Sequence, residues 1–310
     1  MNNSRILANV PAGCVDLQVN GFVGVDFSAP RLRVEDVRRA TKALLQRGTG
    51  AYCPTVITNE SWMYEVNLPV LAAAMEEPDL KPHLLGIHLE GPFLSVEARG
   101  AHQENLLQTS SVARFDHWMK LAKGRIVMLT VAPELEGAEA LIRHVVARNV
   151  VVSLGHHMAD GQCIDRAVRA GATCCTHLGN GIANTLPRHP NPIWTQLADD
   201  RLVGMFITDG HHLPVDFVRV ALRAKGVKNV VVTSDAAPIA GLPPGEYKFA
   251  GAEVVSRPGG RIELKNGYSL AGSSATMEDC IQWLRELGIL SEEELLQVGR
   301  LNPLRVLGFL

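Results

Sequence analysis

Several features that mark other classes of protein are missing from this 310-residue chain. Its 30 lysines and arginines nearly balance its 32 aspartates and glutamates, so the formal net charge is only -2. This balance gives no electrostatic reason to expect nucleic acid or an anionic membrane as a partner. No apolar run is long enough to span a bilayer, and the first residues lack the extended apolar core of a secretory signal.

The six cysteines include no CxxC pair, which argues against a metal knuckle or a redox motif of that type. In a chain of this size, scattered cysteines are typical of reduced thiols in the core rather than of a disulfide framework. We therefore expect a cytoplasmic protein. The cysteines are Cys14, Cys53, Cys163, Cys174, Cys175 and Cys280.

What the chain does have is a large apolar fraction, 46% of its residues, much of it in short runs. Eight runs are typical of buried strands, and helix-like segments separate most of them. This alternation indicates a parallel sheet with right-handed crossovers. We predict an α/β fold in one domain over residues 1–310, a (β/α)8 TIM-type barrel, with an open doubly wound sheet as the alternative. The expected strands are 15–19, 51–55, 84–89, 126–131, 150–154, 173–176, 203–207 and 230–233.

Two segments interrupt the alternation. Residues 94–111 are long and polar and follow closely on Glu90, where a loop usually carries function. Residues 241–269 are rich in glycine and proline and predict a β-hairpin excursion after the eighth strand. Helices are expected at 34–47, 60–75, 137–148, 163–170 and 214–225, with 276–287 and 291–300 closing the chain.

Four polar residues directly follow predicted strands: Glu90, His156, His177 and Asp235. In a barrel, the carboxyl ends of the strands meet at one mouth. One carboxylate and two imidazoles there would suit a divalent metal with an open coordination position. Asp235 beside that metal would take a proton from water and later return it to a leaving group.

Each of these residues also has a purely structural interpretation. Glu90 would be an exposed acid at a strand end, and Asp235 would be a helix N-cap. Each histidine, taken alone, would be a hydrogen-bonded residue of the core. Their common position after strands favours the functional interpretation, with His157 as a competitor of His156.

The neighbours of these residues suggest supporting roles. His88 shares a strand face with Glu90, so we expect it to orient Glu90 rather than bind metal. Gln18 and Asn20 share a face of the first strand, where a two-metal hydrolase would offer histidines. Amides are poor zinc ligands, so we expect a single tightly held metal with Gln18 and Asn20 in orienting roles.

Eight stretches of the sequence, in order along almost the whole chain, resemble the N-acetylglucosamine-6-phosphate deacetylase family of the amidohydrolase superfamily. HLEGP combined with the later stretches is specific to that family, whereas any one stretch alone is weak. The stretches are VDLQVNG (15–21), HLEGPFL (88–94), VAPE (131–134), SLGH (153–156), THLGN (176–180), TDGHH (208–212), TSDA (233–236) and LAGSS (270–274).

The resemblance implies a metal site of Glu90, His156 and His177, with Asp235 as general base and acid. It also implies that His102 polarises the acetyl carbonyl. The metal would be divalent, with zinc as the first expectation and iron, cobalt or manganese as alternatives.

The resemblance further implies a binding site for an amino sugar phosphate. Arg188 matches an arginine that reaches the phosphate in the neighbouring subunit, which implies a homodimer, and its planar fork suits phosphate oxygens. From this sequence alone, Arg188 is a solvated loop charge. The other substrate contacts implied are Ala101, Asn180, Gly181, Asp209, His212, Leu270, Ala271 and Gly272.

The chain departs from the family pattern in two ways. Family members usually carry a small β-sandwich built from segments that flank the barrel, and only 14 residues precede Val15 here, so we expect that domain to be absent or much reduced. Gly179 and Gly181 are smaller than the residues expected around Asn180. We therefore expect a looser phosphate pocket.

The expected reaction is release of acetate from N-acetylglucosamine 6-phosphate. Deacetylation of another N-acetyl amino sugar, such as the galactosamine phosphate or an unphosphorylated intermediate, is the alternative enzyme activity. Dihydroorotase-like activity is disfavoured, because such enzymes place paired histidines where Gln18 and Asn20 stand. A non-catalytic sugar-phosphate-binding protein is the alternative from another class.

Overall fold

The structure, a computed structural model, describes residues 10–267 and 269–310. Eight parallel strands pair in sequential order from β1 to β10, while β2 (Gly21–Phe22) and β3 (Val25–Asp26) form a separate two-stranded sheet. Val19 at the end of β1 pairs with Ala236 beyond β10, and Asn20 N donates to Ala236 O at 2.9 Å, which closes the sheet. The strands are β1 (Cys14–Val19), β4 (Thr49–Ile57), β5 (Ile87–Glu90), β6 (Ile126–Val131), β7 (Val151–Leu154), β8 (Cys174–Cys175), β9 (Val203–Ile207) and β10 (Val230–Thr233).

This order confirms the predicted (β/α)8 barrel. An open doubly wound sheet would reverse its strand order at a switch point, and no such reversal occurs among the described strands. All eight predicted strands are present, each within a few residues of its expected bounds.

The strands alternate between two apolar environments. Leu129 and Phe206 join the large cluster that also contains the buried faces of the helices. Their neighbours Met128 and Met205 belong to a separate cluster with Leu17. Because successive side chains of a strand point to opposite faces, the second cluster fills the barrel interior.

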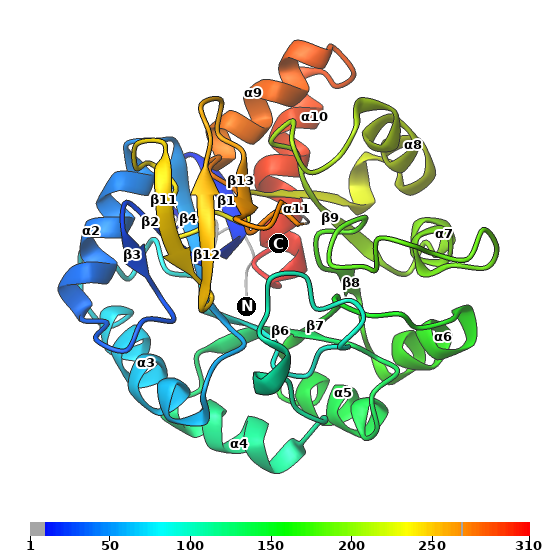
Figure 1. The fold of residues 1–310 in the computed structure, drawn as a ribbon, viewed down its shortest axis with the longest axis horizontal. Helices are drawn as coiled ribbons and strands as arrows, with labels where there is room; N and C mark the ends of the chain where they lie inside the picture. The colour runs from blue at the N-terminus through cyan, green and yellow to red at the C-terminus, as the bar shows by residue number, and fades with distance from the viewer. Residues whose placement is uncertain (1–9, 268) are drawn as a thin grey trace.

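The helices form a ring around the barrel, as Figure 1 shows from α2 at the left round to α9 at the top. Their apolar stripes pack on the strands, and the polar stripes face solvent. They are α2 (Val34–Leu45), α3 (Ser61–Ala74), α4 (Val112–Leu121), α5 (Ala138–Val146), α6 (Gly161–Ala170), α7 (Pro192–Ala198), α8 (Val215–Lys225), α9 (Met277–Leu287), α10 (Glu292–Leu296) and α11 (Asn302–Val306), with a π-helical turn at Gln297–Leu301. Within the described residues, no helix is long and apolar enough to cross a membrane.

Three of these helices, α4, α7 and α11, are not expected from the sequence. The local signals for α7 are present, since Asn191 caps its first turn by accepting from Trp194 N and Pro192 stands at its first position. The signal for α4 is weaker, because only Phe115 and Trp118 of its residues are buried.

The predicted β-hairpin excursion is a three-stranded antiparallel sheet, which we call the roof sheet. It comprises β11 (Gly245–Phe249), β12 (Ala252–Ser256) and β13 (Ile262–Leu264). Its buried residues Phe249, Val254 and Ile262 form an apolar cluster with Ile57 and Ile239 of the barrel. In Figure 1 the roof sheet, in yellow and orange, lies over the barrel on the side of β1 and β4.

Trp118 connects the outer helices to the loop that follows β5. It is 1% exposed, and its ring stacks on Tyr64 of α3 and on Phe93, with centroid distances of 4.4 Å and 5.6 Å. We expect Trp118→Ala to lower the free energy of unfolding by about 3–5 kcal/mol, because it removes a large buried ring and leaves a cavity. Denaturant-induced unfolding measures this loss.

The matched control for this prediction is Trp62→Ala. Trp62 lies on α3 and is 51% exposed, so its loss should change the free energy of unfolding by no more than about 0.5 kcal/mol. Equal losses in the two variants would contradict the placement of Trp118 in the core.

Candidate active site

A cavity of about 500 Å³ opens at the mouth of the barrel, where the carboxyl ends of the strands meet. Its volume is in the range of ordinary small-molecule sites. Strand ends provide Glu90, His156, His177 and Asp235, and the roof sheet contributes further lining. The structure therefore brings together the four strand-end residues on which the sequence prediction rests.

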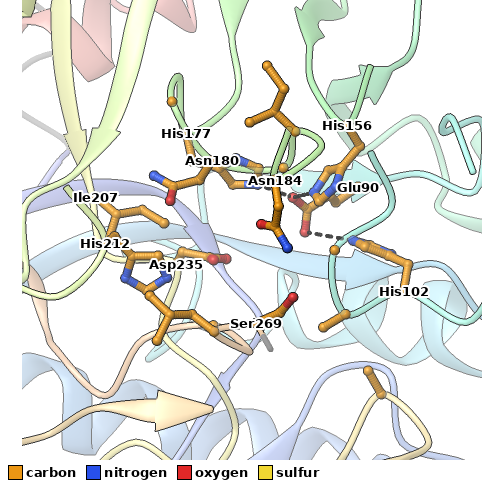
Figure 2. Close-up of a pocket in the computed structure, with 18 of the residues that line it drawn as sticks. Glu90, His102, His156, His177, Asn180, Asn184, Ile207, His212, Asp235 and Ser269 are labelled. Atoms are coloured by element: carbon orange, nitrogen blue, oxygen red, sulfur yellow. Dashed lines mark hydrogen bonds and ion pairs between the residues drawn. The ribbon is translucent and has the colours of Figure 1, made fainter. Parts of the chain in front are cut away.

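Glu90 is the centre of this cluster. Its Oε1 lies 2.9 Å from His177 Nε2 and 3.2 Å from His156 Nε2, and it accepts a hydrogen bond from Gln18 Nε2 at 2.8 Å. His102 Nε2 lies 3.9 Å from the other oxygen, Oε2. Figure 2 shows Glu90 between His156 and His102, with a dashed line from Glu90 to His102.

Charge pairing outweighs burial in setting the protonation of this cluster. Burial alone would raise the pKa of Glu90, but the hydrogen bonds and charges of His156 and His177 hold it well below its usual value. Burial would likewise lower the pKa of His177, yet the Glu90 carboxylate raises it. Glu90 is therefore an ionised carboxylate facing two imidazoles.

The donor atoms suit a divalent metal. His156 Nδ1 donates to the carbonyl oxygen of Ala98 at 2.9 Å, which turns Nε2 toward Glu90. Nδ1 is committed to that carbonyl, so Nε2 is the nitrogen available to bind a cation beside the Glu90 oxygen. A backbone carbonyl on the far nitrogen is the usual support of a metal-binding histidine.

Two histidines lie close enough to Glu90 and His156 to be the third ligand. Glu90, His102 and His156 have ligand atoms within 4.8 Å of one another, so His102 competes with His177 for that place. His177 lies nearer to Glu90, and its Nδ1 has no hydrogen-bond partner among the described residues.

Asp235 lies on the opposite side of the pocket from His102 (Figure 2). Its Oδ1 accepts from Asn20 Nδ2 at 2.8 Å and from Gln18 Nε2 at 2.9 Å, while Gln18 also donates to Glu90. Burial, and next the negative charge of Glu90, raise the pKa of Asp235 to about 7. No helix begins at Asp235, so the N-cap interpretation is wrong.

The backbone turns sharply at three of the strand ends. His156, His177 and Asp235 have φ values of 52°, 28° and 50°, in the left-handed region that non-glycine residues rarely adopt. Such backbone strain tends to persist where the surrounding structure holds a functional side chain in place.

His88 lies beneath the site, and no hydrogen bond among the described residues joins it to Glu90. Its Nδ1 donates to the Leu17 carbonyl oxygen at 3.0 Å, and its Nε2 lies 2.8 Å from Thr130 Oγ1, which in turn bonds Thr176 Oγ1 at 2.7 Å. Burial lowers the pKa of His88 to about 4, so the ring is neutral. Any orienting effect on Glu90 therefore acts through strand positions.

Among the residues implied in substrate binding, six line the cavity. These are Ala101, Asn180, Gly181, His212, Leu270 and Gly272. Ala271 is buried and Asp209 does not line it. Asp209 instead holds His212 through a contact of 2.7 Å to Nδ1. Burial would raise the pKa of Asp209, but His212 keeps it at about 2.

Arg188 lies outside the cavity of its own chain and is exposed. His157, the competitor of His156, is also outside the cavity lining, and its Nδ1 accepts from Ala159 N at 3.2 Å.

The space beside the two glycines is filled, which argues against extra room at these positions. A Cβ on Gly181 would lie 2.7 Å from His177 Cε1 and 3.0 Å from His156 Cε1. A Cβ on Gly179 would lie 2.8 Å from Phe217 Cζ. Both glycines have positive φ, so they let the backbone approach the histidines and Phe217 closely.

Several lining residues escape the sequence analysis. Phe249, Arg261 and Ser269 come from the roof sheet and the segment after it, and Asn184 comes from the loop after β8. The barrel fold predicts that the segments after the strands line a site, but it does not predict which of their side chains do so.

Known proteins resemble this chain over almost its whole length. The sequence profile of the amidohydrolase family matches residues 9–308. The chain is 35% identical to the N-acetylglucosamine-6-phosphate deacetylase of Homo sapiens, covering 98% of this chain and 75% of that protein. It is 31% identical to the N-acetylgalactosamine-6-phosphate deacetylase of Escherichia coli O157:H7, covering 95% and 77%.

A solved structure has the same fold. It is a mutant N-acetyl-D-glucosamine-6-phosphate deacetylase from Mycobacterium smegmatis in complex with N-acetyl-D-glucosamine-6-phosphate. It superposes with a TM-score of 0.87 at 28% identity, covering 96% of this chain and 77% of that chain.

The geometry around Glu90 predicts how metal content responds to mutation. Loss of a residue that hydrogen-bonds to a metal ligand typically costs about 10–100-fold in metal affinity. We expect His177→Asn to lower zinc affinity by more than this, because it removes a ligand nitrogen itself. We expect His102→Asn to keep one zinc per chain. Elemental analysis after dialysis against a zinc buffer measures both, and the reverse pattern would make His102 the ligand.

Proposed function

The chain belongs to the amidohydrolase family, and from this membership and its site we infer that it hydrolyses the N-acetyl group of N-acetylglucosamine 6-phosphate. The products are glucosamine 6-phosphate and acetate. The observation that carries this function is the convergence of Glu90, His156, His177 and Asp235 on one cavity, in a chain similar to these deacetylases throughout its length.

The proposed metal ligands are Glu90, His156 and His177, with zinc as the preferred ion and iron, cobalt or manganese as alternatives. A divalent metal held there supplies polarisation of the acetamide carbonyl and acidifies water for attack. The chain's own contribution is to hold these donors at the mouth and to move the proton.

Asp235 is the proposed general base and then the general acid. Asn20 and Gln18 both donate to its Oδ1, an arrangement that leaves Oδ2 for exchange with water. Its raised pKa suits a group that accepts a proton from the attacking water and passes it to the amine nitrogen of the leaving sugar.

His102 is the proposed hydrogen-bond donor to the acetyl carbonyl oxygen. Burial, followed by the charge of His156, lowers the pKa of His102 to about 3, so the ring is neutral and donates from one nitrogen. Its Nδ1 is buried and has no hydrogen-bond partner among the described residues. A donor held free in this way stabilises negative charge as it develops on the carbonyl oxygen.

The sugar phosphate is proposed to lie against the lining residues Ala101, Asn180, Gly181, His212, Leu270 and Gly272. Asp209 would fix the orientation of His212. The buried Ala271 would hold its neighbours in sequence, Leu270 and Gly272, in place. The exposed Arg188 is proposed to reach the site of a neighbouring subunit in a homodimer.

Residues 1–310 are proposed to act as one catalytic unit, because a single barrel carries every proposed catalytic group. A cytoplasmic location is also proposed. All six cysteines are free in the structure, as expected in a reducing compartment.

The galactosamine phosphate is the second candidate substrate, because a relative at 31% identity is named for it. A non-catalytic sugar-phosphate-binding role is disfavoured, since binding alone has no need of a carboxylate held like Asp235. Rates on the two phosphorylated sugars and on unphosphorylated N-acetylglucosamine separate these activities.

The experiment that tests the function is acetate release by the zinc-loaded protein. We expect the highest kcat/KM with N-acetylglucosamine 6-phosphate. A higher value with N-acetylgalactosamine 6-phosphate would reassign the substrate, and binding without acetate release from any of the three sugars would leave a binding protein.

Asp235→Asn tests the proton transfer separately. We expect kcat to fall by at least about 10²–10⁴-fold, the range of general acid–base catalysis, because the amide cannot accept the proton. Zinc content should stay at one per chain. Near-normal turnover by this variant would exclude Asp235 as the base.

A further inference from the structure

The charge at the cavity comes almost entirely from its metal and base groups. Among the described residues that line it, Arg261 is the only lysine or arginine. The carboxylates of Glu90 and Asp235 face the same space, and the proposed metal would offset their charge. A phosphorylated substrate would bring further negative charge, and Arg261 is a permanent cation at the wall that could meet it.

Arg261 stands at the end of a turn between β12 and β13 that is fixed to the barrel. Arg257 N donates to Arg261 O at 2.8 Å, which closes the turn. His211 Nε2 donates to Gly259 O at 2.8 Å, and Ser274 Oγ donates to Gly260 O. The contacts from His211 and Ser274 thus hold the closed turn at a set position.

The anchoring residue His211 places this turn beside the loop after β9. Its neighbour in sequence, His212, lines the same cavity and is held by Asp209. A Cβ on Gly260 would lie 3.9 Å from His211 Nε2, so the turn and this loop are in contact. Arg261 therefore lies at the wall to which His212 also belongs.

The charge of Arg261 is only partly compensated. Glu263 Oε1 accepts from Arg257 Nε at 2.9 Å, and Glu263 Oε2 accepts from Arg261 Nε at 3.0 Å. Two arginines share one carboxylate, so the group carries a net charge of +1. A guanidinium has five N–H donors, and its bond through Nε leaves others for a second anion.

We propose that Arg261 binds the phosphate of the substrate from within the same chain and so makes the enzyme selective for phosphorylated N-acetyl amino sugars. This inference rests on the proposed function, and it adds a residue that the sequence resemblance does not implicate. The guanidinium fork pairs with two phosphate oxygens, while Glu263 holds the side chain in position. Both arginines are exposed, but Arg261 lines the cavity of its own chain and Arg188 does not, so Arg261 needs no partner subunit.

Arg257 provides a matched control. It belongs to the same turn and pairs with the same carboxylate, but it does not line the cavity. Arg257→Gln and Arg261→Gln therefore remove the same charge from the same cluster, and only the second removes it from the cavity wall.

The test measures kcat and KM for N-acetylglucosamine 6-phosphate and for unphosphorylated N-acetylglucosamine. We expect Arg261→Gln to raise KM for the phosphorylated sugar about ten- to hundredfold, the value of a charge-assisted hydrogen bond, with kcat changed by less than about threefold. Values for the unphosphorylated sugar should not change. Arg257→Gln should match the parent protein, and Arg261→Lys should recover part of the lost affinity.

Each other outcome overturns the proposal. Unchanged KM in Arg261→Gln, an equal loss on both sugars, or an equal loss in Arg257→Gln would give Arg261 only a structural role. If the parent protein releases no acetate, the proposed function fails, and calorimetric titration with glucose 6-phosphate then decides on Arg261 alone. Equal binding by the parent protein and Arg261→Gln would refute the inference there.

Discussion

A buried negative charge, the carboxylate of Glu90, is the constraint on which the mouth of the barrel depends. Desolvation makes such a charge costly unless donors or cations surround it. His156, His177 and Gln18 meet one of its oxygens, and each comes from a different strand. Gln18 extends the arrangement to Asp235. The contacts that compensate the buried charge are therefore the same contacts that align the proposed catalytic groups.

Barrel geometry makes this convergence possible and also strains it. The strands stop at one level, and the chain turns through left-handed conformations at His156, His177 and Asp235. Those turns direct the side chains over the barrel instead of along the sheet. The packed layer beneath, with Met128 and Met205, gives the mouth a rigid base. Local strain is tolerated because the closed sheet below it is continuous.

The sequence predicts the barrel and the four strand-end residues because both follow from local patterns, namely apolar runs and the residue after each run. It fails where the position of a side chain depends on contacts between segments that are far apart in the sequence. Arg261 reaches the cavity only because His211 and Ser274 hold its turn, and no local signal reports those contacts. The two glycines illustrate a related limit, because residue size alone does not reveal that Phe217 fills the space beside Gly179.

The roof sheet is one continuous stretch of chain inserted between the last barrel strand and α9. It contributes to the cavity wall, whereas the proposed metal ligands and general base all follow barrel strands. One part of the proposed substrate contact, Arg261, is thus encoded apart from the groups proposed to cleave the bond. Natural selection, or a mutant library confined to Gly245–Leu264, can alter which sugar is accepted while the machinery that cleaves the amide is inherited unchanged.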